Sequence, residues 1–208
     1  MFLDREEAGE KLCFKLEKYV RDRNCIVIAL ARGGVVLGKV IADYFKLPLD
    51  VLVIKKVGAP RNSELAIGAV GPKNTVYWNN DLCQVLGIGK TEKLELKKAK
   101  ESARKEQESL LPIKNIGLSG KSVILVDDGI ATGATAIAAG KFLKKEKAKE
   151  TILAVPVMPN DALVDIKRYF DIVCVLKKVN FFYAVGQYYK NFPQIENEEV
   201  ARILGRSV

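Results

Sequence analysis

Short apolar runs alternate along the chain with segments in which apolar residues recur every three or four positions. A run that is apolar on both faces predicts a buried strand, whereas the wider spacing predicts a helix with one apolar face. Strands are therefore expected at residues 25–31, 50–54, 123–126, 151–157 and 172–176. Helices are expected at residues 4–23, 35–45, 133–145 and 161–169, with a last short helix ending near residue 204.

Strands that alternate with helices predict an α/β fold, a doubly wound, mainly parallel five-stranded sheet with helices on both faces. Ligands bind such sheets outside the carboxyl ends of the strands. Three unusual segments follow three of the predicted strands: Arg32-Gly33-Gly34, Lys55-Lys56 and residues 127–135. Their shared position at one edge of the sheet favours a single site over three unrelated loops.

The middle of the chain departs from this alternation. Glycine, proline and asparagine predict a loop at residues 57–71, whose last part forms a hairpin with residues 75–78. Residues 89–111 interleave lysine with glutamate, which is typical of a solvated helix and not of a nucleic-acid-binding arm. We interpret the whole chain, residues 1–208, as one domain with an insertion at residues 57–115.

Composition narrows the possible chemistry. The 208 residues include 34 basic and 25 acidic ones, and the net charge of +9 favours an acidic partner such as a phosphate or a nucleotide. There is no histidine, which excludes Ser-His-Asp and Cys-His nucleophiles and histidine-ligated zinc. The four cysteines form no CxxC pair and are expected to be buried in a reducing compartment.

No apolar run reaches the length of a membrane span, and acidic residues near the start do not fit a secretory signal. The expected location is therefore cytoplasmic, with no membrane partner.

The segment VILVDDGIATGAT, residues 123–135, carries the sharpest chemical signal. Small residues after the strand let the backbone approach a ligand closely, and the N-terminus of the following helix suits a phosphate. Asp127 and Asp128 can accept hydrogen bonds from vicinal hydroxyls such as those of a ribose. The segment thus predicts a sugar-phosphate site, and it is not a Walker A loop because no lysine follows Gly133.

The same segment resembles the phosphoribosyl pyrophosphate motif of type I phosphoribosyltransferases. The resemblance implies that Asp127 and Asp128 bind the ribose and act in catalysis. It also implies that the 5′-phosphate lies in the loop that follows, formed by Gly129, Ala131, Thr132, Gly133, Ala134 and Thr135. Where enzymes for 6-oxopurines have an aspartate, this chain has Ala131, so it is unlike that group.

Other segments fit the same family. Arg32 and Gly33 match its diphosphate loop, and Lys56 matches the basic pair that opens its mobile lid. Glu64, in that lid, is the candidate general base, because the chain has no histidine. Segments such as FLDREEAGEKL, KKVGAPRNSELAIGAV and AVGQYY further resemble a subgroup of stand-alone members, and this likeness spans nearly the whole chain.

The aromatic segment, residues 180–208, resembles the hood that covers the acceptor, with Phe182 and Tyr183 as stacking partners. No aspartate in this tail is expected to bind a metal directly. The implied cofactor is Mg²⁺, held mainly by the diphosphate and ribose oxygens.

These features predict a Mg²⁺-dependent enzyme that transfers the 5-phosphoribosyl group to a nitrogenous base or amine and releases diphosphate. Its partners are then phosphoribosyl pyrophosphate and a small acceptor, with a homodimer permitted and nucleic acid not expected. One alternative is a weakly catalytic regulator that binds nucleic acid through its basic surface, for example residues 141–149. A dinucleotide-binding oxidoreductase is disfavoured, since Gly33, Gly34 and Gly38 do not form G-x-G-x-x-G.

Overall fold

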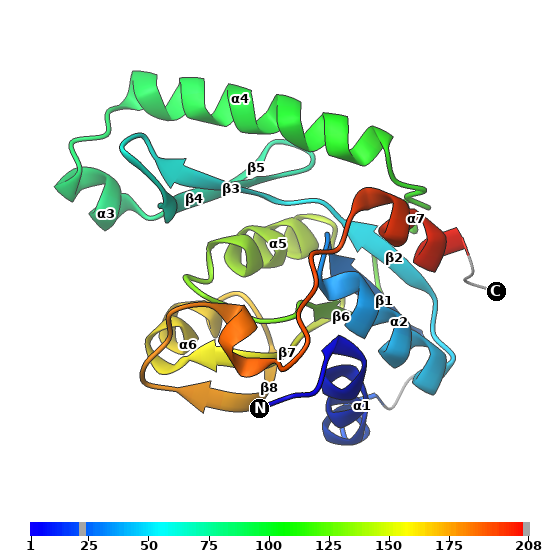
Figure 1. The fold of residues 1–208 in the computed structure, drawn as a ribbon. Helices are drawn as coiled ribbons and strands as arrows, with labels where there is room; N and C mark the ends of the chain where they lie inside the picture. Colours follow the sequence, from blue (N-terminus) through cyan, green and yellow to red (C-terminus); the bar gives the residue numbers. More distant parts are fainter. Residues whose placement is uncertain (21–23, 206–208) are drawn as a thin grey trace.

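The main sheet contains the predicted strands in parallel. The structure, a computed structural model, describes residues 1–20 and 24–205 (Figure 1). Within these residues the sheet has the strand order β2-β1-β6-β7-β8, and all neighbouring strands are parallel. Its strands are β1 (Cys25–Leu30), β2 (Leu49–Leu52), β6 (Ser122–Val126), β7 (Glu150–Pro159) and β8 (Ile172–Val179).

Helices cover both faces of this sheet, which confirms the predicted doubly wound fold. On one face lie α1 (Arg5–Leu16) and α2 (Gly34–Phe45), and on the other lie α5 (Ala134–Lys145) and α6 (Asn160–Ile166). Successive residues of β1 serve the two cores in turn: Val27 packs with α1 and α2, whereas Ile28 packs on the side of α5. This alternation explains why the strand is apolar throughout.

Residues 55–109 build a second layer above the main sheet. Strands β3 (Lys55–Ala59), β4 (Asn62–Gly71) and β5 (Thr75–Trp78) form an antiparallel sheet, followed by α3 (Asn80–Val85) and α4 (Lys90–Ser109). Figure 1 shows this sheet between the long helix α4 and helix α5 of the main fold. The predicted β4–β5 hairpin and the charged helix are thus confirmed.

The loop predicted for the first part of residues 57–71 is wrong, because β3 and β4 pair there, whereas the strand expected in its last part lies within β4. Val57 and Ile67 are fully buried in the core of the second layer. Gly58 stands at a register shift, where an added methyl would lie 2.2 Å from the Ser63 carbonyl oxygen. The glycine that suggested a loop therefore permits the backbones of β3 and β4 to approach closely.

The first residues of the chain pair with residues 188–191, through backbone hydrogen bonds of Phe2 and Leu3. Helix α1 begins after Asp4, whose side chain accepts a hydrogen bond from the Glu7 amide at 2.9 Å. The helix ends at Leu16 and not at residue 23, and residues 21–23 lie outside the described ones. The helix expected at residues 161–169 is α6, which begins at Asn160 after Pro159 and ends at Ile166.

After β8 the chain passes through a short 3-10 helix, η1 (Val185–Tyr188), and an extended segment to α7 (Asn197–Gly205). We call residues 189–196 the C-terminal strap. It runs from η1 up to α7 across the edge of the main sheet (Figure 1).

The four cysteines are buried, as expected. Among the described helices, none is long and apolar enough to cross a membrane.

Candidate active site

Two adjacent strands bring the glycine loop and the acid pair together. Strands β1 and β6 are parallel neighbours, with Ala29 opposite Val126, so the residues that follow them meet at the same edge. A methyl added to Gly33 would lie 1.9 Å from Oδ2 of Asp128, and one added to Gly34 would lie 2.6 Å from the Val126 carbonyl oxygen. These two positions therefore need glycine for the loop to close onto the acid pair.

The acid pair is largely enclosed by protein. Asp127 accepts a hydrogen bond from the Asp128 amide at 2.9 Å, and the Asp128 side chain is 14% exposed. Burial, reinforced by the neighbouring Asp128 charge, raises the pKa of Asp127 well above its usual value. Burial also raises the pKa of Asp128, although the guanidinium of Arg5 opposes that rise. Two such carboxylates, partly shielded from water, can bind a pair of hydroxyl donors strongly.

Arg5 is the functional candidate that the sequence reasoning missed. Its Nε and Nη2 atoms lie 2.9 and 2.8 Å from Oδ2 of Asp128. The spacing did contain a signal: Arg5 precedes Ala8, Leu12 and Leu16 on the buried face of α1. A charged residue on the apolar face of a helix needs a buried partner, and periodicity could not say which one.

The segment after the acid pair has the form of an anion-binding loop. Gly133 has φ = +78° and precedes the first residue of the 12-residue helix α5. Ala131 and Thr132 are exposed, and the Thr132 hydroxyl accepts a long hydrogen bond of 3.5 Å from the Ala134 amide. Gly129 is enclosed, since an added methyl would lie 2.6 Å from Val185. The predicted residues 129–135 thus lie together at the N-terminus of α5, where free N–H groups favour an anion.

A cavity of about 390 Å³ lies beside the glycine loop. Arg32 and Lys55 line it, together with Glu106 and Gln107 of α4 and Asn197 of α7. Burial lowers the pKa of Lys55, and the positive charge of Arg32 lowers it further. Arg32 forms an ion pair of 2.5 Å with Glu196 of the strap. The two cations of the lining outnumber its one acid, Glu106, so the cavity favours a negatively charged group.

Lys56 and Glu64 lie on the hairpin, away from that cavity lining. Because β3 is a strand, its two lysines point to opposite sides, and Lys55 is the one in the cavity. Lys56 pairs with Glu64 across the hairpin at 3.5 Å, and the Glu64 side chain is 89% exposed. The diphosphate role of Lys56 and the base role of Glu64 stay predictions.

The tail aromatics divide into two groups. Tyr183 is exposed, and Phe182 stacks on Tyr188 with ring centroids 5.6 Å apart. The aromatic that reaches the acid pair is Tyr189, whose hydroxyl donates to the Asp128 carbonyl oxygen at 2.6 Å. The sequence reasoning chose the right segment and did not single out this residue. An acceptor role for Phe182 and Tyr183 stays a prediction.

One edge of the parallel sheet thus carries the acid pair, the loop before α5 and the glycine loop after β1. Residues 3–190 match the model of the phosphoribosyl transferase domain, and the chain belongs to this family.

Two comparisons show the extent of the likeness. A Mycobacterium tuberculosis (strain H37Rv) protein named "Putative phosphoribosyl transferase" is 36% identical over 209 residues, which cover 100% of this chain and 47% of the relative. The chain thus spans about half the length of the curated relatives it matches. The crystal structure of the protein TT1426 from Thermus thermophilus is 32% identical, with a TM-score of 0.79 and coverage of 98% of this chain and 97% of that one.

A more distant structure supports the fold alone. The purine phosphoribosyltransferase of Pyrococcus horikoshii is 20% identical, with a TM-score of 0.50 and coverage of 92% of each chain.

Proposed function

We propose that this protein transfers the 5-phosphoribosyl group from phosphoribosyl pyrophosphate to a nitrogenous base or amine and releases diphosphate. The observation that carries the proposal is the direct succession of an acid pair and an anion loop at the end of β6, beside the glycine loop after β1. This order places a diol-binding group between two anion-binding regions, which matches the order of charges along the substrate.

Each region takes one part of the substrate. The loop of residues 129–135 holds the 5′-phosphate, and Asp127 and Asp128 accept hydrogen bonds from the ribose hydroxyls. Arg32 and the backbone of Gly33 face the diphosphate, with Lys55 lining the same cavity. As diphosphate leaves, the sugar gains positive charge, which the nearby carboxylates stabilise.

Mg²⁺ is part of the proposal. Within the described residues no three acidic or cysteine side chains gather into a metal site, and Asp128 is already paired with Arg5. Oxygen donors suit this ion, so the diphosphate and ribose oxygens would supply most of its ligands. When bound, Mg²⁺ would neutralise part of the diphosphate charge and so favour its departure.

We further propose that residues 57–115 act as a lid within one domain and residues 180–208 as a hood over the acceptor. The hairpin β3–β4 continues directly from the cavity residue Lys55, so its movement would change access to the site. In this arrangement Glu64 reaches the acceptor only after the lid closes. Phe182 or Tyr183 stacks on the acceptor. Such closure excludes water, which competes with the acceptor as nucleophile.

The decisive test is calorimetric titration with phosphoribosyl pyrophosphate and Mg²⁺. Each charged contact to the ribose contributes about 1.5–3 kcal/mol, so Asp127→Asn/Asp128→Asn should abolish measurable binding. Asp161→Asn/Asp165→Asn, which removes two acids of α6, is the matched control and should bind as the wild type does. Failure of the folded wild type to bind would refute the proposal. A screen of purine, pyrimidine and amine acceptors for diphosphate release would then define the second substrate.

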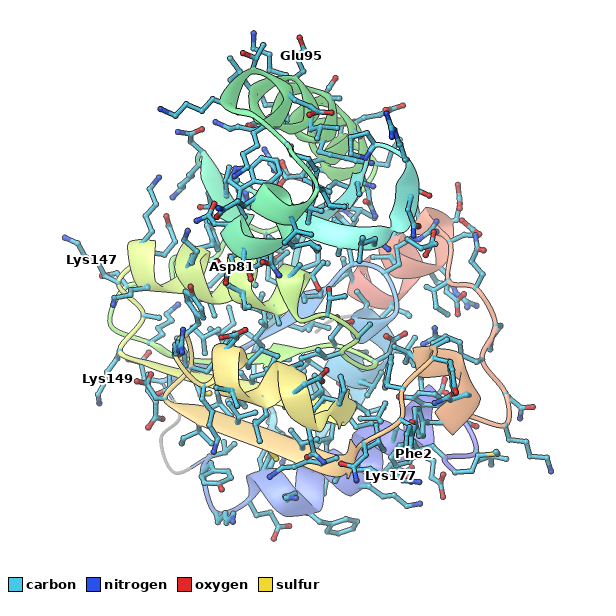
Figure 2. The ribbon with its side chains drawn as sticks, turned by 90° about the vertical axis from the view of Figure 1, so that its left-hand side faces the viewer. Phe2, Asp81, Glu95, Lys147, Lys149 and Lys177 are labelled. Carbon is cyan, nitrogen blue, oxygen red and sulfur yellow. The ribbon has the colours of Figure 1, made fainter. Side chains whose placement is uncertain are left out.

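A second candidate function is nucleic-acid binding through a basic groove. The groove, of about 620 Å³, lies between α5, α6 and the start of β7. Its charged lining residues are one acid, Asp171, and five bases, Lys141, Lys144, Lys149, Lys167 and Arg168. Figure 2 shows Lys147 and Lys149 extending outward along the same edge of the molecule. Such a surface suits a phosphate backbone.

Fluorescence anisotropy with a labelled single-stranded RNA tests this function. Affinity should fall steeply with salt and should be lost in Lys144→Glu/Lys149→Glu. The same charge change on α4, Lys98→Glu/Lys105→Glu, is the control. Equal loss in both variants would indicate attraction to net charge alone and would refute a specific groove.

A further inference from the structure

Arg5 has a fixed orientation at the edge of the acid pair. Only 5% of the residue is exposed, and two of its nitrogens contact Oδ2 of Asp128. The third, Nη1, donates to the Pro193 carbonyl oxygen at 2.7 Å. The guanidinium carbon lies 3.7 Å from the ring centroid of Phe192. Strap residues thus hold both the edge and the face of the guanidinium, which leaves it little freedom to rotate.

Arg5 contacts one carboxylate oxygen of Asp128 and leaves the other, Oδ1, free to accept a hydrogen bond from a ligand. Both contacts are to Oδ2. Oδ1 receives none of the hydrogen bonds found within residues 1–20 and 24–205, and the Asp128 side chain keeps some solvent exposure. An oxygen that is charged, partly exposed and without a protein donor is suited to a ligand hydroxyl.

The two acids of the pair are therefore unequal. Asp128 has a cationic partner that contacts it through two nitrogens, whereas Asp127 has no ion pair in the part of the chain that the structure describes. Arg5 is the positively charged group that lowers the pKa of both acids. The hydroxyl of Tyr189 donates to the backbone carbonyl oxygen of Asp128 and not to its carboxylate. Removal of Arg5 would leave two carboxylates side by side in a poorly solvated place, where one would take up a proton.

We propose that Arg5 is a positioning residue of the transferase site. It fixes Asp128 through Oδ2, keeps that carboxylate charged, and directs Oδ1 to a ribose hydroxyl. The inference rests on the proposed function, and it adds a residue outside the motif segments to which that function assigned roles. It also makes the strap part of the site, because Phe192 and Pro193 hold the guanidinium in place.

The test compares Arg5→Met and Arg5→Lys with Arg168→Met. Arg168 is also an ion-paired arginine, 3.6 Å from Asp165, but it follows α6 and lies outside the proposed site and lid. Affinity for phosphoribosyl pyrophosphate with Mg²⁺ is measured between pH 5 and 8. Arg5→Met should weaken binding about 10- to 100-fold and shift the acidic limb of the profile to higher pH. Arg5→Lys should recover part of both effects, since it keeps the charge without the bidentate geometry.

A second readout needs no ligand. Carboxyl ¹³C NMR of the free protein should show Asp128 titrating at higher pH in Arg5→Met than in the wild type or in Arg168→Met. If Arg5→Met does not fold, the same comparison is made with Arg5→Lys. An unchanged Asp128 titration, or an equal loss of affinity in Arg168→Met, would overturn the role of Arg5. Absence of binding by the wild type would instead overturn the proposed function, and with it the ribose contact.

Discussion

Gly33 and Asp128 are in contact in such a way that no side chain fits between them: a methyl on Gly33 would lie 1.9 Å from Oδ2. The same hypothetical methyl would lie 3.3 Å from Nε of Arg5. The glycine loop, the acid pair and the first helix therefore form one packed unit. A change in any of the three must displace the other two.

Gly33→Ala tests this unit directly. The methyl must push Asp128 off Arg5 or move the loop, and such overpacking costs about 1–3 kcal/mol of folding free energy. Denaturant unfolding should show this loss, and titration with phosphoribosyl pyrophosphate should show weaker binding. Gly117→Ala, where nothing lies within 4 Å, is the control and should change neither. Wild-type affinity in Gly33→Ala would contradict the packing described here.

Asp127→Asn should stabilise the free protein while it weakens substrate binding. Burial and the Asp128 charge raise the pKa of Asp127 in the folded state, so the folded protein binds more protons than the unfolded chain. The contribution of Asp127 to folding stability is therefore fully present below the pKa of the unfolded chain. It is lost as the pH rises through the higher pKa of the folded protein. The neutral amide escapes that loss and keeps an oxygen for the Asp128 amide.

The expected gain is about 1–3 kcal/mol in the free energy of unfolding at pH 7, falling toward zero near pH 3. Urea unfolding of both proteins across that range measures it. A variant that is less stable than the wild type at pH 7 would show that Asp127 is well solvated after all.

Glu196→Gln should strengthen the binding of Mg²⁺-diphosphate. In the free protein the Glu196 carboxylate pairs with Arg32, so under the proposed function the diphosphate has to displace it from the guanidinium. The pair is partly exposed, at 33% and 53% for the two side chains, so the gain should not exceed about 1 kcal/mol, or about fivefold in affinity. Calorimetry measures the change.

The control for that change is Glu199→Gln, which removes another acid of the same region, paired with Arg202 at 3.7 Å. If both variants gain equally, the effect comes from overall charge and not from release of Arg32.

Cys13 should report global unfolding. Burial raises the pKa of its thiol to about 11, so very little thiolate forms at pH 8. Reaction with an aromatic disulfide reagent should be slow in the native protein and fast in urea, with the other buried cysteines following the same pattern. Rapid labelling of native Cys13, identified by mass spectrometry, would indicate local opening of α1. Cys13→Ala serves to assign the signal.

The sequence pattern predicted those features of the structure that depend on residues close together in the chain. The apolar runs located the strands of the main sheet, and the acid pair with its small-residue loop located the candidate site, because both signals lie within about a dozen consecutive positions. The pairing of β3 with the first part of β4 was missed, since Gly58 lies where the two strands approach closely and not in a turn. Strand formation there depends on packing beneath α4, which no local pattern contains.

Arg5 and Tyr189 were missed for a related reason. Each lies more than 60 positions from Asp128, and the contacts arise only when both ends of the chain reach the same sheet edge. Likewise, the choice between Lys55 and Lys56 depends on which face of β3 meets the cavity. Alternation along a strand separates two such residues but cannot say which of them faces inward.

The strap also constrains how the protein can be made on a ribosome. Arg5 emerges first, its partner Asp128 emerges 123 residues later, and the groups that hold the guanidinium, Phe192 and Pro193, later still. Arg5 therefore stays without its folded environment until the strap has been synthesised. Completion of the site must wait for the strap, whatever the order in which the strands pair.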